Sequence, residues 1–186
     1  MNRELSASYI SEIRKISEEI RTKFSSLSHD QLNFKPAADK WSIAQCLQHI
    51  MHLNTAYFPR IEENLKKAEE KNRLANKAFR ANLLTRLTIK ALQPGNKSRF
   101  KAYEVFKPVQ SDIPVTLFEE FEKHHEKLIE LIRSSEKYNW NKVKIASPAN
   151  RFVRFQLGGL FLLMIVHAQR HILQAEKVKE MLDVRC

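Results

Sequence analysis

The sequence predicts an all-α protein with the architecture of a four-helix bundle. Apolar residues recur every three or four positions in four long stretches, which is the period of an amphipathic helix. The 186 residues include only 3 glycines, whereas a β architecture with many turns uses glycine often. With 43% hydrophobic and 28% charged residues at this length, we expect one globular domain over residues 1–186.

The first two long helices are predicted within the first 70 residues. The first carries an apolar stripe formed by Tyr9, Ile13, Ile16, Ile20 and Phe24. After a loop over 25–40, Ser42 is expected to cap the second helix, with Gln45 as its capping-box partner and Trp41 packed on Cys46. Pro59 removes a backbone donor inside this helix and therefore predicts a kink.

A longer crossover is predicted between the second and third long helices. It is expected to hold a short amphipathic helix that ends before Pro94, with an apolar face of Phe79, Leu83, Leu84 and Leu87. Thr116 is expected to begin the third long helix, with Glu119 as its capping-box partner. A loop containing Trp140 and Pro148 then leads to the fourth long helix, expected over 154–182.

The formal net charge of +11 is concentrated in the basic segment 76–107, where eight lysines and arginines accompany one acid, Glu104. Such an excess attracts nucleic acid, acidic lipid or an anionic small molecule, and a solvated basic surface is the simpler interpretation. Because no nucleic-acid-binding motif accompanies it, we expect no specific nucleic-acid partner.

The cysteine pattern, the first residues of the chain and the length of its apolar stretches predict a cytoplasmic protein with no membrane partner. Cys46 and Cys186 lie far apart and make no disulfide framework, which favours a reducing compartment. The first residues contain no apolar core of a secretory signal. The longest apolar stretch, 157–166, is too short to span a bilayer.

Two histidines on the fourth helix are the strongest indication of a functional site. His167 and His171 lie within its apolar arc, one above the other and about 6 Å apart along the helix axis. Two imidazoles so placed can converge on one metal ion. Because buried imidazoles need partners, either a metal or separate hydrogen bonds within the core must satisfy them.

Further ligand candidates lie on the other helices. His49, at the edge of the second helix's apolar arc, is the candidate third ligand. Cys46, one turn earlier, is either a soft ligand suited to zinc or a small apolar residue under Trp41. His125, on the buried stripe of the third helix, is a rival ligand, a lining residue or an ordinary core histidine. Three other histidines are given no functional role, namely His29, His52 and His124.

Two segments resemble proteins of the DinB/YfiT-like family. The run LSHDQLNFKPAADKWSIAQCLQHI, residues 27–50, resembles their opening, with Lys-Pro, then Trp-Ser, then a histidine eight residues after the tryptophan. The run SPANRFVRFQLGGLFLLMIVHAQRHILQAEKV, residues 147–178, resembles their last helix, with H-x-x-x-H followed by glutamine. The resemblance extends over most of the chain, although residues 70–115 contribute little to it.

This resemblance implies a DinB/YfiT-type four-helix bundle in which His49, His167 and His171 bind one divalent metal ion. Zinc and nickel are the metals associated with such proteins, which are often homodimers. Some relatives are S-transferases that join a low-molecular-weight bacterial thiol, such as bacillithiol, to an electrophile, and others are described as metal-dependent hydrolases. The name of the family does not imply DNA chemistry here.

Three neutral imidazoles leave a tetrahedral ion one open position, where a thiol or a water becomes acidic. The sequence thus favours a metal-dependent S-transferase or hydrolase that acts on a small molecule. It offers no evident general base close to the predicted ligands. Gln45 and Gln174 are candidates to hold the rings of His49 and His171. The alternative function is a non-catalytic metal-binding or stress-response module that uses the basic segment 76–107.

Two arginines near the start of the fourth helix are candidate substrate-binding residues. Arg151 and Arg154 either hold an anionic group of the substrate or face water.

Overall fold

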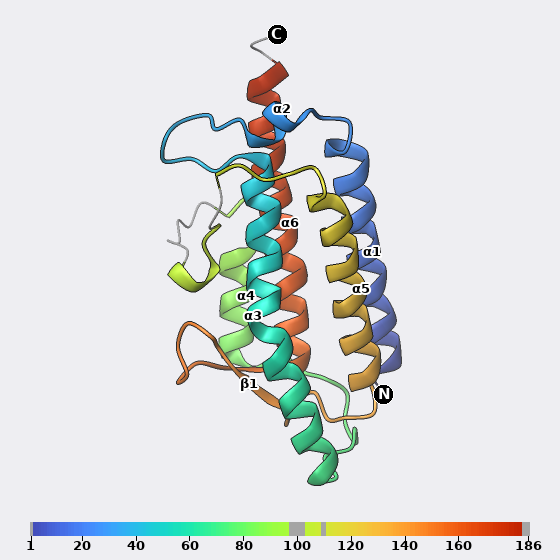
Figure 1. Ribbon diagram of the computed structural model, residues 1–186. Helices are drawn as coiled ribbons and strands as arrows, with labels where there is room; N and C mark the ends of the chain where they lie inside the picture. The colour runs from blue at the N-terminus through green and yellow to red at the C-terminus, as the bar shows by residue number, and fades with distance from the viewer. Residues whose placement is uncertain (1, 97–102, 109–110, 184–186) are drawn as a thin grey trace.

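The computed structural model describes residues 2–96, 103–108 and 111–183, and Figure 1 shows a long helical bundle with a small two-stranded sheet at one end. The elements in chain order are α1 (Arg3–Phe24), α2 (His29–Asn33), α3 (Ile43–Glu70), α4 (Leu83–Leu92), the 3-10 helix η1 (Glu104–Phe106), α5 (Leu117–Ser135), β1 (Lys144–Ala146), β2 (Arg154–Gln156) and α6 (Leu157–Asp183). Cys186 and part of the basic segment, including Lys97, Arg99 and Lys101, lie outside the described residues.

The four long helices α1, α3, α5 and α6 form the bundle. Both α1 and α3 pack against α5 and α6, so the first two long helices lie diagonally across the bundle from each other. In Figure 1, α1 and α6 run upward whereas α3 and α5 run downward. Because α3 and α5 share a direction, the chain must return along the bundle between them, over residues 71–116. The predicted all-α bundle with a longer crossover between its second and third helices is confirmed.

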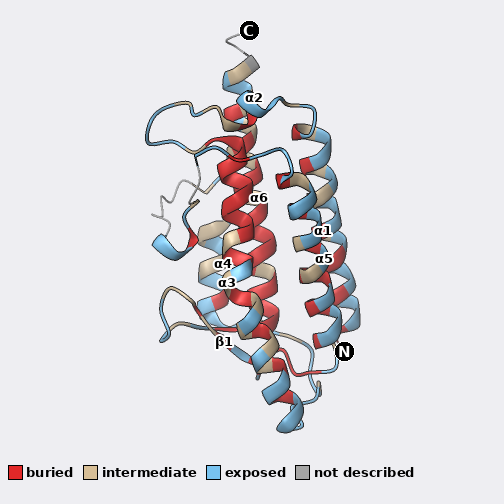
Figure 2. Cartoon of the chain, viewed as in Figure 1, coloured by how far each residue is buried: buried red, intermediate tan, exposed pale blue. Residues whose placement is uncertain are grey.

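The hydrophobic core is centred on α6. Nearly every residue from Leu157 to Ala168 is buried, whereas α1 and α5 each bury one face, as the red and blue bands of Figure 2 show. A helix that is apolar all round belongs in the interior of a bundle. Within the described ranges, no helix has both the length and the apolar character that crossing a bilayer requires.

The start of α3 agrees with the sequence. The Ser42 hydroxyl accepts a hydrogen bond from the Gln45 amide, and the Gln45 side chain accepts one from the Ser42 amide, which completes the predicted capping box. The helix then continues through Pro59 to Glu70. A second capping box, between Ser28 and Gln31, begins the short helix α2 inside the stretch predicted to be a loop.

One predicted helix start is wrong, and another is correct in position but lacks its predicted cap, since Thr116 is the residue that directly precedes α5. Thr116 makes no side-chain cap on α5, because its own backbone is already helical and a turn satisfies the next amides: Leu117 N–H donates to the Pro114 carbonyl. The last helix begins at Leu157 and not at residue 154. Residues 154–156 are instead β2, which pairs antiparallel with β1 in the stretch predicted to be a loop.

The short helix predicted in the crossover is present as α4 and ends before Pro94, but most of its predicted apolar face is wrong, since only Phe79, which precedes α4, packs against the core. Leu83, Leu84 and Leu87 are 68%, 40% and 57% exposed, and the residue of α4 that is buried is Thr85. Helix α4 packs on α6 through this small residue because Gly159 has no side chain there. A Cβ atom at position 159 would lie 2.7 Å from the Thr85 side chain, too close for any real contact.

Candidate metal centre

Packing of α3 on α6 brings three buried histidines together. His49 lies in the second turn of α3, and His167 and His171 lie one turn apart near the middle of α6. They are 3%, 5% and 9% exposed. One ring nitrogen from each lies within 4.8 Å of the corresponding nitrogens of the other two, so the group can hold a metal ion.

The spacing of two of the ring nitrogens fits a tetrahedral ion. Nε2 of His49 lies 3.1 Å from Nε2 of His167. Zinc binds imidazole nitrogen at about 2.0–2.1 Å, which places two ligands of a tetrahedral site about 3.3 Å apart. These two nitrogens therefore already lie at nearly the separation that one shared ion requires.

Outer hydrogen bonds orient two of the three rings. Nδ1 of His49 lies 2.6 Å from the carbonyl oxygen of Phe106 in η1, and Nδ1 of His171 lies 3.1 Å from Oε1 of Gln174. Because both oxygens only accept, each ring donates from Nδ1 and keeps the lone pair of Nε2 for a metal. The hydrogen bond predicted between Gln174 and His171 is present.

The carbonyl of Phe106 accepts the hydrogen bond from the ring of His49. The sequence suggested Gln45 as the partner for this ring. Oε1 of Gln45 accepts instead from the backbone amide of Ser42. Phe106 is 57 residues from His49 in the chain, and a backbone carbonyl has no signature in the side-chain pattern. Only the path of the crossover over α3 could reveal it.

His167 is oriented differently from its neighbours. Its Nδ1 is buried and has no hydrogen-bond partner within the described part of the chain. The ring contacts the other two imidazoles, with centroid separations of 4.8 Å to His49 and 4.4 Å to His171. Its orientation therefore depends on packing in the α3–α6 core.

Burial keeps the three imidazoles neutral. Loss of solvation lowers the pKa of His49 to about 4 and that of His171 to about 3, and it lowers the pKa of His167 well below its usual value. Repulsion between neighbouring rings adds to the last two shifts. Since metal binding requires the neutral ring, the group is ready to bind a cation at neutral pH without first losing protons.

Trp41 covers one side of the histidine group. Its half-buried ring lies 4.7 Å from the ring centroid of His49 and 5.8 Å from that of His171. Cys46 is fully buried and does not belong to the potential ligand group. Burial raises the pKa of its thiol to about 12, so the thiolate that would bind a metal is strongly disfavoured.

His125 lies elsewhere, on α5 where it packs on α1. Its Nδ1 is 2.6 Å from Oγ of Ser17, and its ring packs edge-on against Phe121. It is buried but is not part of the three-histidine group. His52 and His124 also have other contacts, with the Lys107 carbonyl and the Phe58 ring respectively.

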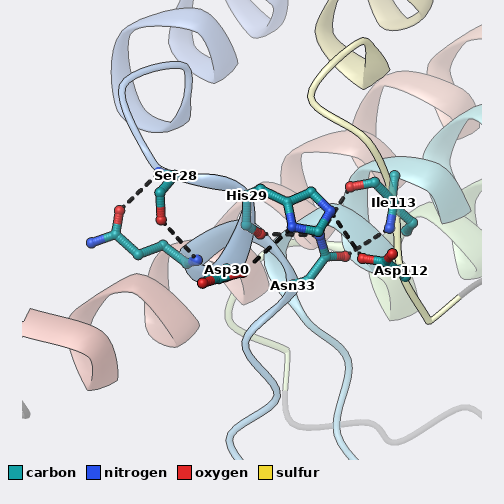
Figure 3. Close-up of polar contacts among 7 residues, drawn as sticks. Ser28, His29, Asp30, Asn33, Asp112 and Ile113 are labelled. Atoms are coloured by element: carbon teal, nitrogen blue, oxygen red, sulfur yellow. Dashed lines mark hydrogen bonds and ion pairs between the residues drawn. The ribbon is translucent and has the colours of Figure 1, made fainter.

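His29 belongs to a polar contact that fastens α2 to the segment before α5, drawn in Figure 3. Its Nε2 lies 2.9 Å from a carboxylate oxygen of Asp112. One turn later, Asn33 both donates to and accepts from the backbone of Ile113, at 2.9 Å in each direction. These bonds connect α2 to the segment before α5 at one end of the bundle, which is a structural role.

The two candidate arginines are distant from the histidines. Arg151 and Arg154 are exposed, in the hairpin that precedes α6. His167 is ten residues beyond Leu157, which corresponds to about 15 Å of helix. Arg151 and Arg154 therefore cannot hold a substrate group at the three-histidine centre. Both are exposed to water instead.

The fold and the site together define a four-helix bundle protein with a buried three-histidine group able to hold a metal ion. The family model of the DinB superfamily matches residues 12–175, and the chain belongs to that superfamily. The resemblance noted in the sequence is thereby confirmed.

The fold is similar to that of YfiT from Bacillus subtilis, described as a probable metal-dependent hydrolase with an unusual four-helix bundle topology. The two chains are 11% identical, with a TM-score of 0.61, and the similarity covers 98% of this chain and 90% of YfiT. At this identity the likeness shows the fold alone. No curated protein matches the sequence.

Proposed function

We propose that His49, His167 and His171 bind one divalent ion, zinc or nickel, and that the protein is a metal-dependent enzyme acting on a small molecule. The observation that carries this proposal is the convergence of three neutral, buried imidazoles from two helices. Zinc sites with three protein ligands are the catalytic kind, because one position stays open. The description of YfiT as a probable metal-dependent hydrolase supports the same class.

When bound, the ion supplies a Lewis acid whose open position lowers the pKa of a thiol or a water. The residues of the chain orient the ligands and limit the access of solvent. The Phe106 carbonyl and Gln174 hold two of the rings, and Trp41 shields one side from solvent. The ligand group itself contains no carboxylate, so we assign no general base.

The two reactions compatible with this centre are thiol S-transfer and hydrolysis. In S-transfer, the sulfur of a low-molecular-weight thiol forms a bond to an electrophilic carbon, the leaving group departs from that carbon, and the thiol proton passes to solvent. A reduced thiol of this kind is abundant in the cytoplasm, the compartment that the cysteine pattern predicts. Since each histidine is at most 9% exposed, we expect a small substrate. Assembly into a homodimer stays a prediction.

The proposal is tested in two stages with His171→Ala and a matched control, His125→Gln. Elemental analysis of the purified proteins is expected to find about one zinc or nickel per wild-type or His125→Gln chain and none in His171→Ala. Protein without stoichiometric metal, including after reconstitution with either ion, would refute the metal site.

Activity is then measured with each metal. One assay measures conjugation of free cysteine, a small thiol, to 1-chloro-2,4-dinitrobenzene. The other measures hydrolysis of 4-nitrophenyl acetate. We expect turnover by the wild type and His125→Gln and background rates with His171→Ala. Metal-loaded protein that performs neither reaction above background would count against the enzyme and leave a metal-binding module.

A further inference from the structure

A second feature lies at the other end of α3 from the histidines. Two neighbouring recesses, of about 580 and 690 Å³, open there and share Asn76, Asn141 and Lys142. From His49 to Glu70 the helix rises about 30 Å, so these recesses are remote from the metal centre. We call the two together the basic recess.

The basic recess is lined by positive charge without compensating acids. Its basic side chains are Lys71, Arg73, Lys77, Arg80, Lys142 and Lys144. The lining includes no aspartate or glutamate, and in the described part of the chain none of the six forms an ion pair. By contrast, Lys137 nearby is paired with Glu69 at 2.9 Å. Loss of solvation lowers the pKa of Lys144. An anion bound in the recess would raise this pKa again by stabilising the charged ammonium group.

The walls of the basic recess come from separate segments that are bonded to each other. Asn139 donates through its backbone amide to the Arg73 carbonyl at 2.8 Å and through its side chain to Asn76 Oδ1 at 2.7 Å. The side chain of Asn141 donates to the Ala78 carbonyl at 3.0 Å. These bonds hold the backbones that carry the charges, so part of the ordering needed to bind a ligand is already complete.

The shape and the lining indicate the class of ligand. Recesses of this size accept small molecules, whereas a specific protein–DNA interface buries about 1,000–2,500 Å² of protein surface. No aromatic side chain lines either recess, so there is no platform on which a nucleic-acid base could stack. Lysine ammonium groups and paired arginine donors are the groups that bind phosphate oxygens.

We propose that the basic recess is a binding site for a small molecule that carries two or more linked phosphates. The site is independent of the proposed metal chemistry, because its residues lie at the opposite end of α3. It would accept the phosphate chain of a nucleotide or an inorganic polyphosphate, and the common chemistry is the pyrophosphate group.

The test is calorimetric titration of metal-free protein with sodium tripolyphosphate at about 150 mM salt, where long-range attraction is screened. Metal is removed first because tripolyphosphate itself chelates divalent ions. We expect saturable binding of one molecule per chain. Removing two lining charges in Lys77→Gln/Lys142→Gln should weaken binding at least about tenfold, or 1.4 kcal/mol.

The matched control removes two charges far from the recess, in Lys123→Gln/Lys177→Gln, both exposed on α5 and α6. It should change the affinity less than about twofold, since screened charges far from the ligand contribute little. Equal weakening by both pairs would show only the general attraction of a cationic protein, and would overturn the proposal. Failure to saturate would overturn it too.

Three further titrations separate the sources of phosphate. ATP that binds like tripolyphosphate, with adenosine not binding, would show recognition of the phosphate chain of a nucleotide; tripolyphosphate binding alone would indicate an inorganic ligand. Tighter, Lys142-dependent binding of a duplex oligonucleotide would overturn the small-molecule proposal in favour of a nucleic-acid surface. His167→Ala should bind tripolyphosphate like the wild type, so this site is tested even if the metal centre fails.

Discussion

The bundle buries histidines in two places, and the two places differ in one respect. Between α1 and α5, His125 is 3% exposed and has its own protein partner, the hydroxyl of Ser17. Between α3 and α6, three histidines of similar burial turn their rings toward one another, with two Nε2 atoms 3.1 Å apart. Burial is therefore common to both sites, and convergence of ring nitrogens is found at one.

Burial has the same electrostatic consequence in both places. It lowers the pKa of His125 to about 3, as it does that of His171. A strongly shifted histidine is thus not by itself a sign of function in this protein. What distinguishes the α3–α6 group is that several lone pairs meet at one point, where a cation can satisfy them together.

The largest expected difference between the two places is in metal affinity. His167→Ala should weaken binding of zinc or nickel at least about 100-fold, beyond the range for losing an outer hydrogen bond, because one of three ligands is gone. His125→Gln should leave the affinity unchanged. Competition titration against a chromophoric chelator measures both, and a comparable loss in His125→Gln would erase the distinction.

Metal should also stabilise the fold through the α3–α6 group alone. At a free metal concentration 100 times the dissociation constant, the free energy of unfolding should rise by about 2.7 kcal/mol. Urea unfolding with metal and with chelator gives this difference. The rise should persist in His125→Gln and vanish in His167→Ala; a rise in His167→Ala would place the bound ion elsewhere.

Acid should destabilise the protein partly through His125. The unfolded imidazole binds a proton below its usual pKa of 6.5, whereas the folded one stays neutral down to about 3. Stability is therefore fully present above pH 6.5 and falls as the pH drops toward 3, by about 1.4 kcal/mol per pH unit for this one group.

His125→Gln tests this without removing the partner of Ser17, because the amide can still hydrogen-bond to the hydroxyl. Urea unfolding of metal-free protein between pH 6 and pH 4.5 should show a shallower pH dependence in the variant, by about one proton. The α3–α6 histidines contribute equally to both proteins and so cancel. Identical slopes would mean that His125 is protonated in the fold.

The smallest expected effect concerns the outer partner of His171. Gln174→Ala should weaken metal binding about tenfold, since the ring would lose the acceptor that orients it. Ser17→Ala makes the corresponding change at His125 and should leave metal affinity unchanged. If both variants bind metal like the wild type, the contact between Gln174 and His171 has no role in holding a ligand.

Local patterns in the sequence were sufficient for much of the fold. Apolar residues at helical spacing predicted the four long helices, and Ser42 with Gln45 predicted the start of α3. The same reasoning found the position of Thr116 but wrongly gave it a capping box, because a preceding turn satisfies the backbone there. It failed at the start of α6, where residues 154–156 pair with residues 144–146 as a strand. It also failed on α4, where Leu83, Leu84 and Leu87 are exposed because a glycine on α6 admits Thr85.

The sequence by itself determined which residues share a face of one helix, because helical periodicity is a local property. It placed His167 and His171 together and Gln174 one turn from His171. Only the tertiary structure decided that His49 approaches them while His125 does not, since packing between helices sets which faces meet. The carbonyl of Phe106 at His49 and the gathering of six basic side chains in one recess arise in the same way, from segments far apart in the chain.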